Sequence, residues 1–264
     1  NKTVSIQGAF GSYSYVTAVS QFNKTVPLLC RKQFKDVFND VKSGRAEYAL
    51  LPFRNIITGA IHDTFRLLFE YKFSVLREID TPLDHTLLGL SKIPVGKLKY
   101  IYSHPQALSQ CSEFLNSALP KGCAVREVHD TAGAKEYLFK DPDTSALIAS
   151  GKMAKELGLV KIKYPVQNYN KNMTKFLLLS RSPEVKLKTQ GFLFVAAYSK
   201  SLDGMVRQLT EIKAGLKIID GFQVVLKPGK TAVFFRVQVS GRSSVAALQQ
   251  LSAIKEISYS SGVF

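Results

Sequence analysis

A hydroxyl and a cation stand side by side where a polar turn enters an apolar segment. The stretch 172–180 reads Asn-Met-Thr-Lys-Phe-Leu-Leu-Leu-Ser, so Asn172, Thr174 and Lys175 lie at its start. Its apolar part predicts a buried strand. A strand that begins in this way can present a hydroxyl and an ammonium group to one anionic ligand. The alternative is a surface turn that leads into a core strand and binds nothing.

A second polar phrase follows the short apolar segment 100–102. It reads Ser-His-Pro-Gln-Ala-Leu at 103–108 and predicts the start of a helix that runs to about residue 119. Pro105 suits the first turn, because it has no amide hydrogen to leave unpaired there. Ser103 can cap the helix, which leaves Gln106 and the unpaired N–H groups available to a carboxylate.

A third candidate is Asn55, which follows the apolar segment 48–53 and precedes an expected helix through 61–68. Polar side chains between the carboxyl end of a strand and a helix commonly build ligand sites in open α/β sheets. A turn-forming Asn is the alternative. The glycine-containing turn 8–12 enters an expected helix at 12–22, with Ser12 or Ser14 as N-cap, and its first N–H groups could hold an anion.

The elements that must position these residues alternate between the two periodicities of an α/β protein. Further helices are expected at 31–42, 131–139 and 152–157, and further strands at 3–7, 73–79, 85–90, 123–128, 145–149 and 161–166. With 264 residues the chain exceeds a usual single domain, so two units are expected. A hydrophobic fraction of 45% and a charged fraction of 21% exclude a disordered or fibrous protein.

Composition also limits the partners. No apolar run is long enough to cross a bilayer, so no membrane insertion is expected. The three cysteines and four histidines lack metal-ligand spacing, and no metal or organic cofactor is predicted. The net charge of +16 favours anionic ligands or partners, but no basic block or nucleic-acid motif is present, so RNA is permitted and not indicated. The first residue is not Met, which fits the matrix or stroma of a mitochondrion or plastid; the cytoplasm is the alternative.

Five phrases give the chain a family resemblance. They are Gly-Ser-Tyr-Ser at 11–14, Leu-Pro-Phe-Arg-Asn at 51–55, Ser-His-Pro-Gln-Ala-Leu-Ser-Gln-Cys at 103–111, Asp-Thr-Ala-Gly-Ala at 130–134 and Asn-Met-Thr-Lys-Phe at 172–176. In order and spacing they resemble the prephenate dehydratases and the plant-type arogenate dehydratases. The similarity runs nearly end to end.

The resemblance implies an α/β fold in two parts. A two-lobed, periplasmic-binding-protein-like dehydratase domain would occupy 1–183, with lobe 1 at about 1–84 and 166–183 and lobe 2 at about 85–165. A ferredoxin-like βαββαβ ACT domain would follow at 190–264. The pattern of the tail agrees, since strands are expected at 191–198, 216–226, 231–239 and 257–264 and helices at 203–214 and 243–251.

The resemblance also implies an activity. Such enzymes remove water and carbon dioxide from prephenate or arogenate and release phenylpyruvate or phenylalanine. Thr174 matches the family's catalytic Thr, which assists the leaving hydroxyl. The polar pocket of the family corresponds here to Asn55, Ser103, Gln106, Asn172 and Lys175. A homodimer or larger oligomer that forms through the ACT domain is implied as well.

Several positions depart from the family pattern. Pro-Ile-Glu-Asn-Ser reads Pro-Phe-Arg-Asn-Ile at 52–56, so Arg54 replaces an acid and Ile56 a hydroxyl. If Arg54 faced the ligand, the change of two charge units would be worth several kcal/mol. Lys175 stands where the family has Arg and lacks the fork that grips a carboxylate. Gly204 and Asp220 stand at effector positions, but the Arg of the family's effector loop is absent, so phenylalanine feedback is not expected.

Three hypotheses follow. The chain is an active prephenate or arogenate dehydratase; or it is a catalytically degenerate relative that serves as a subunit of a larger assembly, with RNA as one partner; or it is a sensor that binds an anion without converting it.

Overall fold

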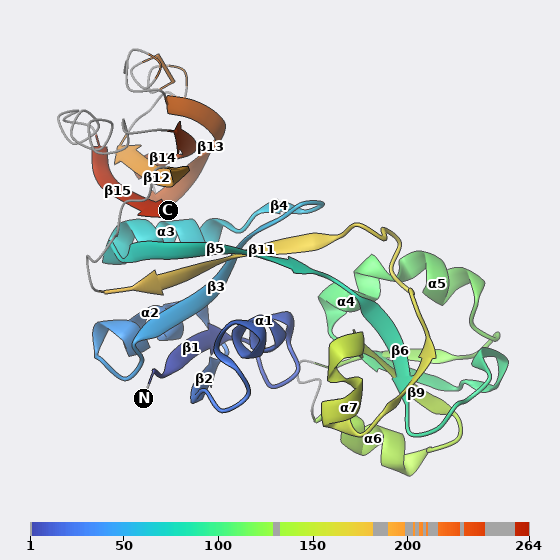
Figure 1. Cartoon of the computed structure of the whole chain (residues 1–264). Helices are drawn as coiled ribbons and strands as arrows, with labels where there is room; N and C mark the ends of the chain where they lie inside the picture. The colour runs from blue at the N-terminus through green and yellow to red at the C-terminus, as the bar shows by residue number, and fades with distance from the viewer. Residues whose placement is uncertain are drawn as a thin grey trace.

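The computed structural model describes residues 2–128, 133–181, 190–198, 203, 206–207, 210, 216–227, 230–240 and 257–263. These residues form a mixed α/β protein with three separate sheets (Figure 1). Two of the sheets build lobes that the chain connects twice, and the third lies beside α3 of the first lobe.

The first sheet has the strand order β2-β1-β3-β11-β5, with β4 on β3. Strand β1 runs parallel to β2 and β3, and β11 runs antiparallel to β3 and β5. Ser12 caps α1, as expected, because its side chain accepts a hydrogen bond from Tyr15 N. The bounds are β1 (Val4–Gln7), α1 (Tyr13–Phe22), β2 (Leu28–Arg31), α2 (Phe34–Lys42), β3 (Tyr48–Asn55), β4 (Gly59–Ala60), α3 (His62–Tyr71), β5 (Ser74–Pro82) and β11 (Met173–Ser180).

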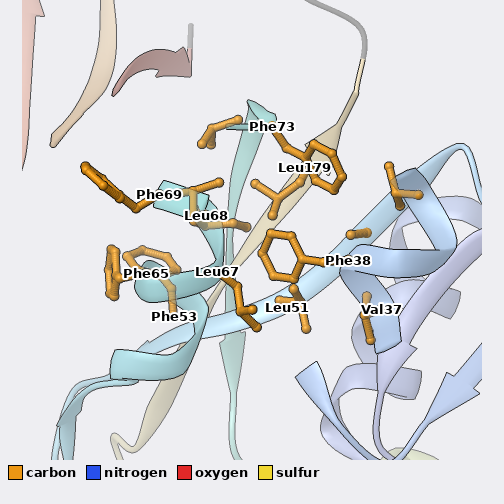
Figure 2. Packing of buried hydrophobic residues seen from close by; sticks show 14 of the residues in the cluster. Val37, Phe38, Leu51, Phe53, Phe65, Leu67, Leu68, Phe69, Phe73 and Leu179 are labelled. Carbon is orange, nitrogen blue, oxygen red and sulfur yellow. The ribbon is translucent and has the colours of Figure 1, made fainter. Parts of the chain in front are cut away.

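The two faces of the first sheet have separate cores. Phe176 and Leu178 of β11 pack in one buried cluster with Ala18 of α1. Leu177 and Leu179 belong to the cluster of α2 and α3, part of which Figure 2 shows. Successive side chains of a strand point to opposite faces. Even-numbered residues of β11 therefore face α1, and odd-numbered residues face α2 and α3.

The second sheet has the order β10-β6-β9-β7-β8. The sequence predicts one helix from 105 to about 119, and that prediction is wrong, because the helix breaks at Cys111 between α4 and α5. The returning chain causes the break: Asn168 N donates to Gln110 O at 2.8 Å, and Asn168 Oδ1 accepts from Glu113 N at 3.1 Å. The bounds are β6 (His85–Gly89), β7 (Tyr100–Ser103), α4 (Pro105–Gln110), α5 (Ser112–Ser117), β8 (Ala124–Glu127), α6 (Ala134–Lys140), β9 (Ser145–Ser150), α7 (Ala154–Leu157) and β10 (Val160–Lys163), with 3-10 turns at Val95–Lys97 and Gly151–Met153.

The two connections between the lobes are bonded to each other. Leu83 N donates to Asn172 O at 2.9 Å, and Gln167 Nε2 donates to Leu83 O at 2.7 Å. Val166 N donates to His85 O at 3.1 Å. The outgoing and returning segments thus form one hydrogen-bonded ribbon, which fixes the start of β11 relative to the start of β6.

The third sheet is antiparallel throughout, in the order β13-β14-β12-β15. Val224 and Phe234 of this sheet complete the buried cluster of α2 and α3. The ring centroids of Phe234 and Phe65 lie 5.4 Å apart in this cluster. The helices expected at 203–214 and 243–251 fall almost wholly outside the described residues, and so does Gly204. The bounds are β12 (Gln190–Tyr198), β13 (Leu216–Lys227), β14 (Lys230–Ser240) and β15 (Ile257–Val263).

Candidate active site

The end of β3 and the start of β11 bring three predicted residues together. Register places Asn55 opposite Thr174. Asn55 Nδ2 lies 3.0 Å from Thr174 Oγ1, 2.9 Å from Asn172 Oδ1 and 3.1 Å from Met173 O. All three predicted side chains are buried, since Asn55 is 2%, Asn172 3% and Thr174 9% exposed. Thr174 shares the face of Phe176 and Leu178, which is the face that α1 covers.

Backbone groups fix the orientation of the Asn55 amide. Ile57 N and Thr58 N donate to Asn55 Oδ1 at 2.9 and 3.0 Å. A backbone N–H can only donate, so the amide oxygen must face the turn and the amide nitrogen must face β11. Thr174 Oγ1 consequently accepts a hydrogen bond from Asn55, and its own hydrogen is left for a different acceptor.

Lys175 lies on the other face of β11. Its Nζ is 2.7 Å from Asp80 Oδ1 and 3.1 Å from Glu78 Oε1, both on β5. Arg236 of β14 forms an ion pair with Glu78, with Nε 3.5 Å from Oε2. Burial, the largest single influence, lowers the pKa of Lys175, but the bonds to Asp80 and Glu78 together outweigh it and raise the pKa.

The structure therefore does not bring Lys175 beside the Thr174 hydroxyl. Arg54 is the register partner of Lys175, whereas Asn55 is the partner of Thr174. Because neighbouring residues of a strand alternate, Arg54 leaves β3 on the side away from the Asn55 amide. Ile56 is 45% exposed, and its backbone N donates to Met173 O at 3.0 Å.

The helix phrase at 103–108 is arranged differently from the prediction. Ser103 does not cap α4: it is buried, and its hydroxyl donates to Ile148 O at 2.6 Å. His104 is the N-cap residue, because its Nδ1 accepts from Gln106 N at 3.3 Å. The Gln106 side chain is exposed on α4, and no described hydrogen bond joins it to Asn55 or Thr174.

Gln110, one helical turn after Gln106, is the residue that reaches this site. Asn172 Nδ2 donates to Gln110 Oε1 at 3.1 Å, and His85 Nε2 lies 2.8 Å from the same oxygen. Gln110 belongs to the phrase 103–111, so the family resemblance was an available signal. His85 carried none, because its partners Gln110 and Tyr13 are distant in sequence.

Two wider features complete the description. Among the described residues, no cluster of three or more His, Cys, Asp and Glu side chains could hold a metal ion. In the same part of the chain, no helix has the length and apolar character needed to cross a membrane.

The fold and the site define a class of protein. It is a two-lobed α/β protein with a buried hydroxyl, hydrogen-bonded to an amide, at the junction of the lobes. The sequence profile of the family described as prephenate dehydratase matches residues 4–184. The chain belongs to this family.

Curated relatives agree. A bifunctional chorismate mutase/prephenate dehydratase of Buchnera aphidicola is 30% identical over 263 residues, which are 96% of this chain and 67% of the relative. Arogenate dehydratase 5, chloroplastic, of Arabidopsis thaliana is 35% identical over 182 residues, which are 68% of this chain and 42% of the relative. The chain thus spans about two thirds of the first relative and less than half of the second.

Solved structures show the same fold. Prephenate dehydratase of Arthrobacter aurescens, in complex with L-Phe, superimposes with a TM-score of 0.79 at 18% identity. The superposition covers 99% of this chain and 88% of the Arthrobacter chain. GqqA, described as a novel type of quorum quenching acylase, gives a TM-score of 0.76 at 23% identity, with 99% of this chain and 96% of its own covered. At such identities the likeness establishes the fold alone.

Proposed function

We propose that this chain catalyses the decarboxylating dehydration of prephenate or arogenate to phenylpyruvate or phenylalanine. The observation that supports the proposal most directly is the bond from Asn55 Nδ2 to Thr174 Oγ1, because it leaves the hydroxyl hydrogen of Thr174 for a substrate oxygen. Membership of the family supplies the reaction class.

The chemistry needs one well-placed donor. The bond between the ring and the carboxylate breaks, its electrons enter the ring, and the opposite ring C–O bond breaks as the ring becomes aromatic. Thr174 donates its hydroxyl proton to the departing oxygen, which leaves as water, and Thr174 takes a proton back from solvent afterwards. The Asn55 N–H group stabilises the negative charge that develops on Thr174 Oγ1 as this hydrogen moves toward the leaving oxygen.

The other predicted pocket residues take different roles in this proposal. Gln106 is exposed and can bind a substrate carboxylate, and Asn172 with Gln110 lines the site. Ser103 has its single O–H group bonded to Ile148 O, so it can act toward substrate only as an acceptor. Lys175, bonded to two acids on the far face, positions β11 and does not grip the substrate.

The decisive experiment follows aromatic product absorbance after the purified chain is mixed with prephenate or with arogenate. Thr174→Val keeps the side-chain shape and removes the donor, so kcat should fall about 100-fold to about 10,000-fold. Thr174→Ser should keep most of the activity. Thr81→Val is the matched control, because Thr81 is the register partner of Thr174 and its buried hydroxyl bonds to Thr17 and not to Asn55. Wild-type turnover no faster than that of Thr174→Val would remove the proposal.

We further propose that the third sheet is an ACT domain at 190–264, after a dehydratase domain at 1–183, and that copies of the chain pair through it. The strand order β13-β14-β12-β15 supports this, since it is the order of a ferredoxin-like βαββαβ unit. Asp220 lies on β13 opposite Arg236, and Gly204 is outside the described residues. Without the family's effector Arg, phenylalanine should cause no thermal shift. The oligomeric state can be read from light scattering.

The second candidate is a non-catalytic relative. It is favoured by Ile56, an exposed alkyl group next to Asn55 where the family has a hydroxyl. A thermal shift with prephenate but no turnover would indicate a sensor. Salt-dependent comigration with RNA or with a large complex, favoured by the charge of +16, would indicate a subunit of an assembly. An organellar stroma or matrix is the proposed compartment, in line with the chloroplastic Arabidopsis relative, and cell fractionation tests it.

A further inference from the structure

A buried histidine contacts both lobes close to the candidate site. His85 is the first residue of β6 and is 2% exposed. Its Nε2 lies 2.8 Å from Gln110 Oε1 of α4 in the second lobe. Its Nδ1 lies 3.2 Å from the hydroxyl of Tyr13 on α1 of the first lobe, a helix that Figure 1 shows on the side toward the second lobe.

The direction of every hydrogen bond from Asn55 to His85 can be derived. Asn55 Nδ2 can only donate, so the Asn172 atom facing it is the oxygen, and the Asn172 nitrogen faces Gln110. That nitrogen also only donates, so the Gln110 atom facing it is Oε1. Because this oxygen only accepts, the ring nitrogen of His85 beside it must carry a hydrogen.

In a neutral imidazole the other ring nitrogen, Nδ1, is then the acceptor. Burial is the main reason that the pKa of His85 is lowered, which favours this neutral form. Asp84 N donates to the Tyr13 oxygen at 3.1 Å, so the Tyr13 hydrogen is directed to His85 Nδ1 at 3.2 Å or to Asp84 Oδ1 at 3.5 Å. Burial chiefly raises the pKa of Tyr13, which keeps that hydrogen in place.

We propose that His85 is a positioning residue for the dehydration, and that it acts as its Nε2–H tautomer by donating a hydrogen bond to Gln110. Gln110 in turn orients the amides of Asn172 and Asn55. The Asn55 amide then keeps Thr174 Oγ1 as a hydrogen-bond acceptor, so that the Thr174 hydrogen stays directed to the substrate. This inference rests on the proposed function. This role links the orientation of the Thr174 hydroxyl on β11 to the contact between Tyr13 of α1 and His85 of β6. A histidine that gained a second proton would lose the acceptor for Tyr13, and the Tyr13 hydrogen would turn to Asp84.

Among the described residues, the titratable groups near this histidine include Tyr13 on α1, Asp84 beside it on the chain and Cys111 next to Gln110. Asp84 Oδ1 also accepts a hydrogen bond from Ser150 Oγ at 2.6 Å. Lys161 of β10 lies near Asp84, because its Nζ and Asp84 Oδ2 would each be 3.3 Å from a Cβ placed on Gly151. Protonation of His85 is therefore the expected origin of an acid limb in the kcat profile.

Two variants with turnover measurements test the inference. His85→Leu removes both bonds at similar volume and should lower kcat about tenfold to about 100-fold, as for other residues that orient a reacting group, with little change in KM. His85→Gln can donate to Gln110 and accept from Tyr13, so it should restore most of kcat and lack the acid limb. An unchanged kcat in His85→Leu, or the wild-type acid limb in His85→Gln, would overturn the role.

A measurement without turnover separates this inference from the proposed function. Nitrogen NMR of histidine-labelled protein should show a buried Nε2–H tautomer whose signal is missing in His85→Gln and becomes a mixture of tautomers in Asn172→Leu. An Nδ1–H tautomer in the wild type overturns the network even in an active enzyme. A chain with no turnover removes the catalytic role, and the tautomer then decides whether the network itself stands.

Discussion

Strand β11 has two faces with opposite chemistry. On the α1 face, Thr174 is held by neutral amides whose bond directions follow from two backbone N–H groups. On the α3 face, Lys175 is held by two carboxylates, one of which also pairs with Arg236 of the third sheet. The two residues are adjacent in the chain and share no described partner.

The contrast shows how one short motif can serve two purposes. A neutral network suits a donor that must work on an anionic substrate, because its geometry is directional and carries no net charge. An ionic cluster is less directional, and removing one partner of a partly buried cluster leaves an uncompensated charge; Lys175 is 18% and Glu78 10% exposed. The face with Thr174 is therefore suited to chemistry, and the face with Lys175 to attachment of the third sheet.

The largest effect is expected on the Thr174 face of β11, from Asn55→Asp. The new carboxylate keeps the bonds to Ile57 N and Thr58 N. It turns its other oxygen toward two acceptors, Asn172 Oδ1 and Met173 O, and toward the Thr174 hydroxyl, whose hydrogen it would draw away from the substrate. The free energy of unfolding at neutral pH should drop by about 3 to 5 kcal/mol, as for an uncompensated buried charge, and kcat should fall at least as far as in Thr174→Val. Urea denaturation and product absorbance measure the two losses.

The pH dependence of that variant gives its control. Burial among acceptors raises the pKa of the new acid in the folded state. The loss of free energy of unfolding should therefore be small below the unfolded-state pKa of about 3.9 and grow as the pH rises above that value. Asn116→Asp, on an exposed helix position, should show neither effect. A stable and active Asn55→Asp protein at neutral pH would contradict the assigned bond directions.

Lys175→Met should affect the other face. It leaves the half-exposed Asp80 without its cation and Glu78 with Arg236 alone, so the free energy of unfolding should fall by about 1 to 3 kcal/mol, while kcat changes less than about tenfold. Lys171→Met, which alters an exposed lysine just before β11, should leave the stability unchanged. A collapse of kcat/KM with intact stability would mean that Lys175 contacts the substrate after all.

Alkaline pH should weaken the ionic contacts on the Lys175 face of β11, with a smaller effect than the two substitutions above. The pKa of Lys175 is raised, despite burial, by Asp80 and Glu78, so its stabilising contribution is present below the ordinary value of 10.5 and is lost as the pH rises through the folded pKa. Lys175→Arg keeps its charge in this range and should have a higher melting temperature than the wild type above about pH 11. Equal melting temperatures of the two proteins at that pH would argue against the ionic cluster.

The smallest effect is expected in acid. Because the pKa of His85 is lowered, chiefly by burial, the neutral form belongs to the folded state, and stability should fall as the pH drops below the ordinary value of 6.5 until the folded pKa is passed. His85→Gln should be less sensitive over this interval in thermal melts. The same slope in both proteins would place the acid sensitivity elsewhere.

Much of the architecture could be predicted from the sequence, because apolar periodicity marks α1, β3, β7 and β11 directly and Ser12 marks a cap. The break at Cys111 could not, since Asn168, far along the chain, causes it. Asn55, Asn172 and Thr174 could be chosen from spacing and resemblance. The choice of Gln106 over Gln110 depended on which residue caps α4, and the role of His85 depends on contacts with two lobes, which a linear pattern does not contain.

The third sheet also has a consequence for the handling of the protein. Val224, Ala232 and Phe234 cover a patch that contains Phe65 and Phe69 of α3. A chain truncated after Ser180 would expose those aromatic rings to water, and exposed apolar patches of this kind promote aggregation. A shortened version made for crystallisation should therefore precipitate on expression unless both phenylalanines are replaced by polar residues.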